Sequence, residues 1–350
     1  MNDFSSCRIE SAVFHYVGNK CLGHEIKFSE NEMILNDLQK EHLNVYFMGN
    51  LKQEMPFYNF VGYPDLDYNT VFRSVRSIFN EKQFLVEESK KIAEVLWEKS
   101  EHPKVNGGEF FVVYITNCIV EDEICDAIGI FKSENKDTFI KVFQDFDNTT
   151  KIDSDKAINI KKLDKGCFVF KTEENLGYKI AVIDNNSKTS QYWFEFLNIE
   201  QRKDNFYNTR YQMVLAKKYS EEIQELNGAS NNEERLKYIE KVENYFSQNE
   251  SFDYNEFTDE VFDNDEEKIE EFESFSTKFQ EENDIKLKSQ FPLSNRAVKD
   301  NKKIFKRTLK LDDNFIVDVK DIESQNIEQG FDEERGKSFY KLYFFNQQMK

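Results

Sequence analysis

The chain has 350 residues, of which 39% are hydrophobic and 15% aromatic, with 47 basic and 66 acidic residues for a net charge of −19. This core-forming content excludes a disordered protein, and the 12 Gly and 4 Pro are too few for collagen-like, linker-like or glycine-rich phosphate-loop architectures. The length predicts about two domains, and a chain of this size needs no disulfide or metal to support a core.

The acidity is concentrated in one part of the chain. Residues 221–290 contain 22 acids and 7 bases, whereas residues 291–350 contain 12 bases and 10 acids. A negative net charge disfavours strong non-specific binding to DNA, but screening over about 8–10 Å leaves a local basic face free to meet an anion.

The sequence carries no sign of export or membrane insertion. Its five cysteines include no Cys-x-x-Cys pair, its start lacks a basic and apolar leader, and its longest apolar run, Phe110–Ile115, is far too short for a bilayer. We therefore expect a cytoplasmic protein with reduced thiols and no membrane contact.

Alternation of apolar and polar residues predicts an antiparallel sheet with flanking helices up to about residue 195. The expected strands are 7–17 and 21–28 as a hairpin, 109–117 and 124–133 as a second hairpin, and 139–144, 157–161, 166–171 and 178–184. The expected helices are 31–50, 69–79 and 81–100.

From residue 196 to residue 350 the composition predicts a second domain. Helical stripes occupy 205–226, 232–247, 253–262 and 265–282, with outer faces rich in Glu, Asp, Asn and Gln. Ser294 is placed to cap a further helix, and 304–311, 315–319 and 339–345 read as a small antiparallel sheet. The predicted fold class is α+β: an N-terminal, mainly antiparallel sheet with helices, an acidic helical layer, and a small C-terminal sheet.

Motifs of common enzymes are absent from the sequence. It has no Walker loop, dinucleotide-binding glycine pattern, His-Glu-x-x-His or Gly-x-Ser-x-Gly, and its four histidines lack metal-ligand spacing. We expect no cofactor and no bound metal, and a binding protein in preference to an enzyme.

One constellation keeps an enzymatic alternative open. A hairpin centred near Glu121 places Glu109 opposite residues 133–134, so that Glu109, Glu134 and Lys136 meet at its open end. Two carboxylates for Mg²⁺ and a lysine beside a water would suit a divalent-metal nuclease, whereas the alternative is a set of solvated charges at strand ends.

Two groups of basic residues are candidate contacts to DNA phosphates. The first comprises Lys132, Lys136, Lys161, Lys162 and Lys165, with Lys141 nearby in sequence, and the second comprises Arg296, Lys299, Lys302, Lys303, Lys306, Arg307 and Lys310. Asp300 is the one acid within the second group, and Phe305 is expected in the core. An ordinary solvated face is the competing interpretation of both groups.

The acidic stretch 221–290 has three interpretations, which the sequence leaves open. It can be the solvated face of a helical subdomain, a docking surface for a basic protein, or a region that weakens non-specific DNA binding by repulsion.

Several stretches, in the same order along nearly the whole chain, resemble the bacterial nucleoid-associated protein family of the NdpA/YejK type. They are Ser100-Glu101-His102-Pro103, Asn106-Gly107-Gly108-Glu109, the run from Ala127 to Lys136, the run from Ile158 to Cys167, Tyr192-Trp193 before Phe196-Leu197, Leu311 to Phe315, Phe331 to Glu334, and Tyr340 to Phe344. Ala157, where a glycine is expected, and Ile316, where a histidine often stands, depart from the pattern.

The resemblance implies a non-enzymatic, cytoplasmic protein of the bacterial nucleoid that binds DNA or DNA-bound proteins. The partner is then double-stranded DNA, reached through the basic groups. The alternative is a basic DNA-processing protein such as a topoisomerase, docked on the acidic helices without direct DNA contact. The oligomeric state is not readable from the sequence.

Overall fold

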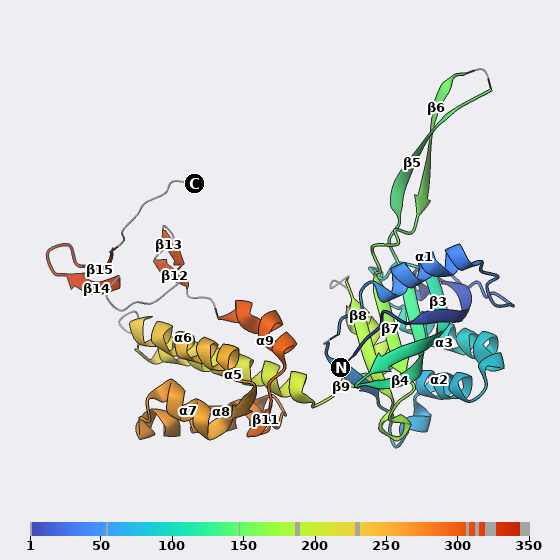
Figure 1. Cartoon of the computed structure of the whole chain (residues 1–350). Coiled ribbons are helices and arrows are strands. Elements are labelled where there is room, and N and C mark those ends of the chain that lie inside the picture. Colours follow the sequence, from blue (N-terminus) through green and yellow to red (C-terminus); the bar gives the residue numbers. More distant parts are fainter. Residues whose placement is uncertain are drawn as a thin grey trace. The chain divides into compact units, whose positions relative to one another are not determined.

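The chain folds into two compact units, Met1–Arg202 (unit 1) and Lys203–Lys350 (unit 2), as shown by a computed structural model (Figure 1). The structure describes residues 2–53, 55–146, 148–185, 190–227, 232–305, 308–311, 315–318 and 327–343. The boundary lies after the expected residue 195 because strand β9 (Ile199–Gln201) still belongs to the sheet of unit 1.

Unit 1 is built on a seven-stranded antiparallel sheet with the strand order β1-β3-β4-β7-β8-β2-β9. Its other strands are β1 (Arg8–Val17), β2 (Phe57–Phe60), β3 (Gly108–Val120), β4 (Glu123–Ser133), β7 (Lys165–Phe170) and β8 (Lys179–Asp184). The expected hairpin of β3 and β4 is confirmed, with Glu109 opposite Ser133.

Helices cover both faces of this sheet. Successive side chains of β3 alternate between the two faces and pack against different helices. Phe110 and Val112 belong to a core shared with α2 (Thr70–Asn80), α3 (Leu85–Lys99) and α4 (Ser190–Leu197). Phe111 and Val113 point to the other face, against α1 (Asp37–Met48). The central strands are therefore buried on both sides, and apolar residues occupy both phases of their period-two pattern.

Local capping sets where the helices of unit 1 begin. The helix predicted from residue 31 starts at Asp37, because Asn36 and Gln39 form a reciprocal capping box. The helix predicted over 69–79 is confirmed as α2, with Asn69 as its cap. The helix predicted over 81–100 is divided into the short 3₁₀ helix η3 (Lys82–Phe84) and α3.

Two predicted strands in unit 1 are wrong in place or partner. Residues 21–28 form no second strand, because the backbone of β1 pairs along its length with β3 and pairs with that segment only at the bridge between Tyr16 and Lys27. The strand expected at 157–161 lies earlier, as β6 (Thr150–Ala157). Strands β2 and β9, both short, were not predicted.

Strands β5 (Asp137–Gln144) and β6 form a separate two-stranded arm that projects from the body of unit 1 (Figure 1). Its residues are exposed, apart from a half-buried Asp137.

Unit 2 contains a helical layer with one aromatic core, to which Tyr219, Tyr238 and Phe272 belong. Its helices are α5 (Asn205–Asn227), α6 (Asn232–Gln248), α7 (Tyr254–Phe262), α8 (Glu266–Glu282) and α9 (Asn295–Asn301). The expected helices are present, and Ser294 caps α9 as predicted, accepting a hydrogen bond from the backbone of Ala297.

The short strands of unit 2 form pairs. They are β10 (Ser251–Asp253) with β11 (Gln290–Pro292), β12 (Thr308–Leu311) with β13 (Phe315–Asp318), and β14 (Ile327–Asp332) with β15 (Lys337–Leu342). The small C-terminal sheet is thus present as separate antiparallel hairpins, and the predicted α+β class is confirmed.

Asn69 supports a first testable prediction, because its buried side chain caps α2 and also donates to three backbone carbonyls, those of Val61, Leu197 and Asn198. Asn69→Ala removes the cap and the donor to the buried carbonyl of Leu197, so we expect the free energy of unfolding to fall by about 2–4 kcal/mol.

Urea denaturation measures this loss, with the exposed cap Asn36 as the matched control. Asn36→Ala removes a cap of the same residue type at the protein surface and is expected to cost about 1 kcal/mol. Equal losses in the two variants would contradict the structural role of the Asn69 amide.

Candidate functional site

The open end of the β3–β4 hairpin holds the charged residues predicted from the sequence, but as ion pairs. Lys136 is paired with the carboxylate of Glu109. Glu134 has 1% of its side chain exposed, and its carboxylate lies 3.3 Å from the ammonium of Lys132. Each carboxylate therefore neutralises a lysine of the same chain.

This arrangement differs from an open metal site. The hydroxyl of Tyr192, on α4, donates to the carboxylate of Glu134 and closes that side of it. Among the described residues, no group of three or more His, Cys, Asp or Glu side chains is placed to hold a metal ion. Glu109 and Glu134 thus lie at one end of the hairpin, each engaged with a different lysine.

The prediction that Lys132 and Lys165 face a DNA phosphate is wrong, because both side chains are fully buried (0% exposed). The two lysines stand opposite each other on β4 and β7, and Lys165 stands opposite Asp184 on β8. Lys165 donates to Asp184 over 2.6 Å, and Lys132 donates to the backbone carbonyl of Asn106 over 2.8 Å.

Helix α4 covers this pair of lysines with the ring of Tyr192. The ammonium groups of Lys132 and Lys165 lie 5.1 and 5.5 Å from the ring centroid, a cation–π distance for both. Burial lowers the pKa of Lys132, against the opposing effect of Glu134, and burial raises the pKa of the Tyr192 hydroxyl. The cluster therefore attaches α4 to the end of the sheet.

A second testable prediction follows from these buried charges. Lys165→Met leaves Asp184 in the interior without its cationic partner, so we expect the free energy of unfolding to fall by about 3 kcal/mol or more. Chemical denaturation of the full chain measures the change.

Lys162→Met is the matched control, since Lys162 is paired with Asp137 at the surface. We expect no measurable change in stability from this variant, because exposed ion pairs contribute little. If both variants unfold like the wild type, the buried ion pairs do not stabilise the fold.

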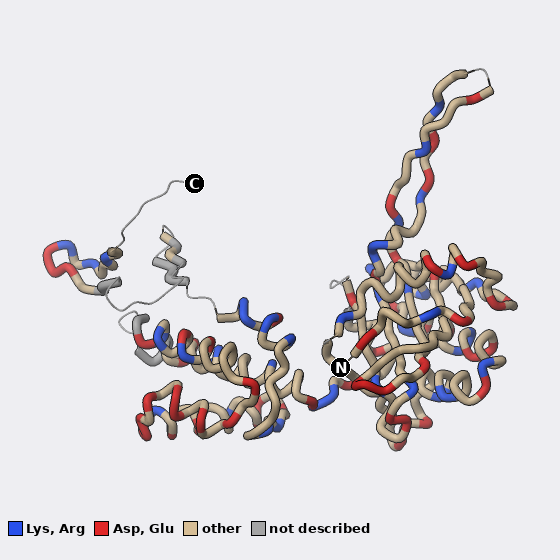
Figure 2. The backbone as a smooth tube through the Cα atoms, viewed as in Figure 1, with Lys and Arg blue, Asp and Glu red and all other residues tan. Residues whose placement is uncertain are grey.

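The remaining members of the first basic group surround the base of the arm, where Figure 2 shows basic residues beside the β5–β6 hairpin. Lys161 is exposed, Lys162 donates to Asp137 over 2.8 Å, and Lys136 is partly exposed. The carboxylate of Asp164 shapes the entry to the arm by accepting from the backbone amides of Glu134 and Asn135.

The second basic group lies on α9 and the following 3₁₀ helix η7 (Lys302–Ile304), which we name the α9–η7 face. Arg296 pairs with Asp300 over 2.8 Å, and Lys302 lies 3.4 Å from Glu243. Lys299 and Lys303 are exposed, and no carboxylate of the described residues lies within ion-pair distance of either. These two lysines are the available cations of this face.

For the other predicted members of the second group, the structure does not describe the side chains. Lys306 and Arg307 lie outside the described residues, and Lys310 is on β12, where the side chains are not described. Phe305 is buried in the core of unit 2, as expected.

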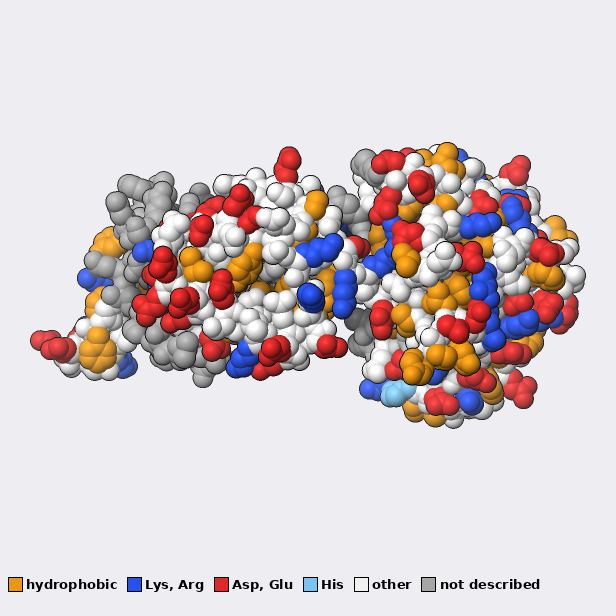
Figure 3. Space-filling view, turned by 90° about the horizontal axis from the view of Figure 1, so that it is seen from below, with side chains coloured by type: hydrophobic (Ala, Val, Ile, Leu, Met, Phe, Trp, Pro, Cys, Tyr) orange, Lys and Arg blue, Asp and Glu red, His pale blue; other side chains and the backbone are white. Residues whose placement is uncertain are grey.

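Charge is segregated within unit 2. The α9–η7 face (residues 295–304) carries four basic residues and one acid, whereas residues 254–282, which form α7 and α8, carry twelve acids and two lysines. On the side of unit 2 seen in Figure 3, acidic side chains gather toward one end and basic side chains toward the other.

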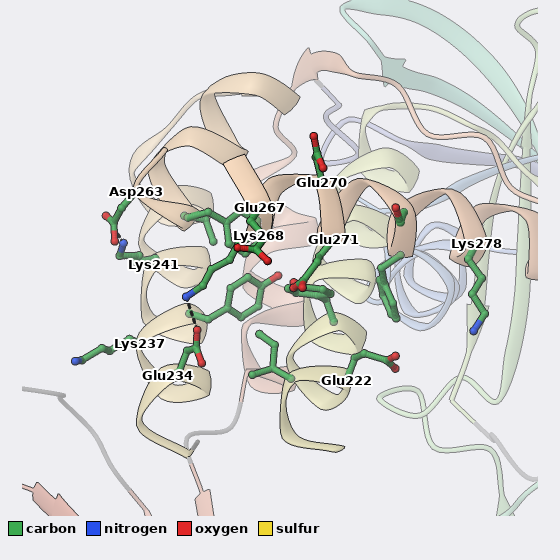
Figure 4. A pocket seen from close by; sticks show the side chains of 17 residues that line it. Glu222, Glu234, Lys237, Lys241, Asp263, Glu267, Lys268, Glu270, Glu271 and Lys278 are labelled. Atoms are coloured by element: carbon green, nitrogen blue, oxygen red, sulfur yellow. Dashed lines mark hydrogen bonds and ion pairs between the residues drawn. The ribbon is translucent and has the colours of Figure 1, made fainter. Parts of the chain in front are cut away.

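A groove of about 1010 Å³ lies among α5, α6, α7 and α8 (Figure 4). Apolar and aromatic side chains contribute to its lining: Tyr219, Ile223, Tyr238, Val261, Phe262 and Phe275. Ser274 and ten charged residues complete the lining, the charged ones being Glu222, Glu234, Lys237, Lys241, Asp263, Glu267, Lys268, Glu270, Glu271 and Lys278. We name this feature the acidic groove.

Some of the groove's charges neutralise one another, and others do not. Lys268 and Glu234 reach toward each other in Figure 4 and form an ion pair, as do Lys241 and Asp263. Glu270 and Glu271 are exposed on α8, with no cation of the described residues at ion-pair distance. Burial, reinforced by the neighbouring carboxylates, raises the pKa of Tyr219 to about 12. The groove therefore combines an apolar lining with a negative potential.

The sequence contains a signal for the buried lysines that is separate from any motif. Lys132 lies next to the end of an uninterrupted run of buried residues from Ala127 to Ser133, and Lys165 begins another that ends at Phe170. A run without alternation is typical of a strand covered on both faces, where a lysine must be buried and paired. The groove had no comparable signal, because its lining comes from four separate helices.

One of two comparisons with known proteins identifies a family. A family model described as nucleoid-associated protein YejK matches residues 13–333. A search of curated proteins finds no match. Separately, no helix in the described part of the chain is both long and apolar enough to cross a lipid bilayer.

Proposed function

Because this chain belongs to the nucleoid-associated protein YejK family, we propose that it acts at the bacterial nucleoid as a non-catalytic, cytoplasmic protein that binds double-stranded DNA through the α9–η7 face. The observation that carries this proposal is the exposure of Lys299 and Lys303 on a segment that contains a single acid. Lysines with free ammonium groups neutralise phosphates and release the counterions of the duplex.

The charge distribution of unit 2 supports this choice of face. The carboxylates of α7 and α8 would repel a duplex that approaches them. Because salt screens charges that lie more than about 8–10 Å apart, this repulsion would not extend far beyond these two helices. Contact through a small basic face in an otherwise acidic unit predicts weak binding that is lost steeply as salt is added. The lysines at the base of the arm, Lys136, Lys161 and Lys162, are a second candidate contact.

A third testable prediction concerns the salt dependence of DNA binding. Each phosphate contact contributes about 0.9 to the slope of log K against log salt concentration, so Lys299→Glu with Lys303→Glu should lower that slope by about 2. Fluorescence anisotropy of a labelled duplex, titrated at several salt concentrations, measures the slope for the full chain.

The matched control reverses two other lysines of unit 2, Lys237 and Lys278, which line the acidic groove. This variant has the same net charge as the test variant, and its slope should stay close to the wild-type value. If the two double variants lose affinity equally, net charge governs binding and the α9–η7 face is not the contact. If the wild type does not bind duplex even at low salt, direct DNA binding is wrong.

A second candidate function rests on the acidic groove. An aromatic lining between carboxylates matches an amphipathic helix that carries lysines or arginines beside its apolar face. A basic segment of a DNA-processing protein, such as a topoisomerase, would then bring the chain to the nucleoid without direct DNA contact.

A fourth testable prediction separates this candidate from the first. A labelled amphipathic peptide with leucines on one face and lysines on the other should bind the chain, and Glu270→Lys with Glu271→Lys should weaken the binding by about tenfold or more. Anisotropy of the peptide provides the measurement.

Glu281→Lys with Glu282→Lys is the control, because these exposed residues end the same helix outside the groove and give the same change of net charge. We expect it to bind the peptide nearly as the wild type does. Equal weakening in both variants would show attraction by net charge and would remove the groove from the account.

A further inference from the structure

The β5–β6 arm exposes apolar side chains that no other part of the described structure covers. Phe139, Ile140, Val142, Phe143, Phe146 and Ile152 are all exposed. A two-stranded hairpin without a packing partner is only marginally stable in water, and grouped apolar residues at a surface are typical of an interaction site. The arm therefore has the composition of a structure that another surface covers.

The register of the arm divides its side chains between two faces, because directly opposite residues point to the same side. One face, which we name the uncharged face, carries Val142 opposite Ile152 and Ile140 opposite Ser154. Thr138, Gln144, Thr150 and Lys156 complete it, so that its one charge lies at the base of the arm. Ile140, Val142 and Ile152 are 69%, 65% and 73% exposed.

Most charges of the opposite face are paired within unit 1, whereas Asp153 forms no ion pair with a described residue. Lys141 donates to Asp155 over 2.8 Å, Lys151 pairs with Asp145 near the tip, and Lys162 pairs with Asp137 at the base. A partner that covers the arm would therefore have few unpaired charges of the arm to neutralise.

The arm's charge balance disfavours a nucleic acid as the occupant. Residues 137–157 contain five acids and three lysines, so the arm repels phosphates, although a two-stranded ribbon has dimensions that fit a DNA groove. A protein surface that is apolar and uncharged is the better match.

We infer that the uncharged face of the arm is a self-association surface, and that its occupant is the same face of a second copy of this chain. A chain with a net charge of −19 repels its own copies, and this repulsion is smallest where the surfaces in contact carry almost no charge. A two-fold contact places each residue against the same patch of the partner, and here that patch offers Ile, Val, Thr and Ser to one another. Extended backbone edges on both strands add hydrogen-bonding groups for the second copy.

Sedimentation equilibrium of the full chain tests this proposal. The wild type should form a dimer, and Val142→Glu with Ile152→Glu should raise its dissociation constant by about 100-fold or more, since four carboxylates would then meet without cations. Circular dichroism and thermal unfolding should match the wild type, because both side chains lie outside the cores of the two units.

The matched control exchanges the ion pair on the opposite face. Lys141→Asp with Asp155→Lys keeps the net charge and the pair, and the dimer should persist. Replacing residues 138–156 with an Asn-Gly turn should give a monomer that retains the sheet of unit 1.

Two results would overturn the proposal. One is a wild-type chain that sediments as a monomer at every concentration, in which case the arm serves a different protein. The other is a Val142→Glu, Ile152→Glu variant that dimerises as tightly as the wild type.

Discussion

A charge inside a protein must be neutralised there, and this constraint decides which of the chain's basic residues are available to a ligand. Lys132 and Lys165 lie between the central strands and α4, where Glu134, Asp184 and the ring of Tyr192 surround them. The ion pairs and cation–π contacts of these two lysines therefore stabilise the fold, and their ammonium groups cannot reach a ligand. The candidates for contact with a polyanion are consequently the lysines outside the core, above all Lys299 and Lys303.

Local patterns predicted the fold well where each element is stabilised by its own residues. The register of the β3–β4 hairpin follows from the two-residue turn at Glu121 and Asp122, both with positive φ, and α2 follows from its Asn69 cap. Local patterns were insufficient where a distant strand competes. β1 pairs with β3 in preference to the adjacent segment 21–28, and β2 and β9 become strands only because the sheet edge at β8 needs partners.

The candidate sites also depend partly on local patterns, which the sequence shows, and partly on packing between distant elements, which it does not show. The sequence predicted the register that brings Glu109 opposite Ser133, because a hairpin register is a local property. It could not show that Lys136 pairs with Glu109, whereas Glu134 pairs with Lys132 under Tyr192 from a helix far along the chain. Likewise, the acidic stretch was visible as composition, whereas the groove depends on the packing of four helices. The segregation of charge in unit 2 connects the two proposed functions, since the carboxylates that would receive a basic helix would also repel a duplex and favour its contact with the α9–η7 face.

Lysine footprinting tests the central claim, that buried and exposed lysines have separate roles, in a single measurement. The full chain is acetylated with and without a saturating DNA duplex, and each lysine is quantified by mass spectrometry. The account predicts that Lys132 and Lys165 stay unreactive in both conditions, and that Lys299 and Lys303 react in the free chain and are protected by the duplex. Rapid acetylation of Lys132 and Lys165 in the folded chain, or equal acetylation of Lys299 and Lys303 with and without DNA, would contradict it.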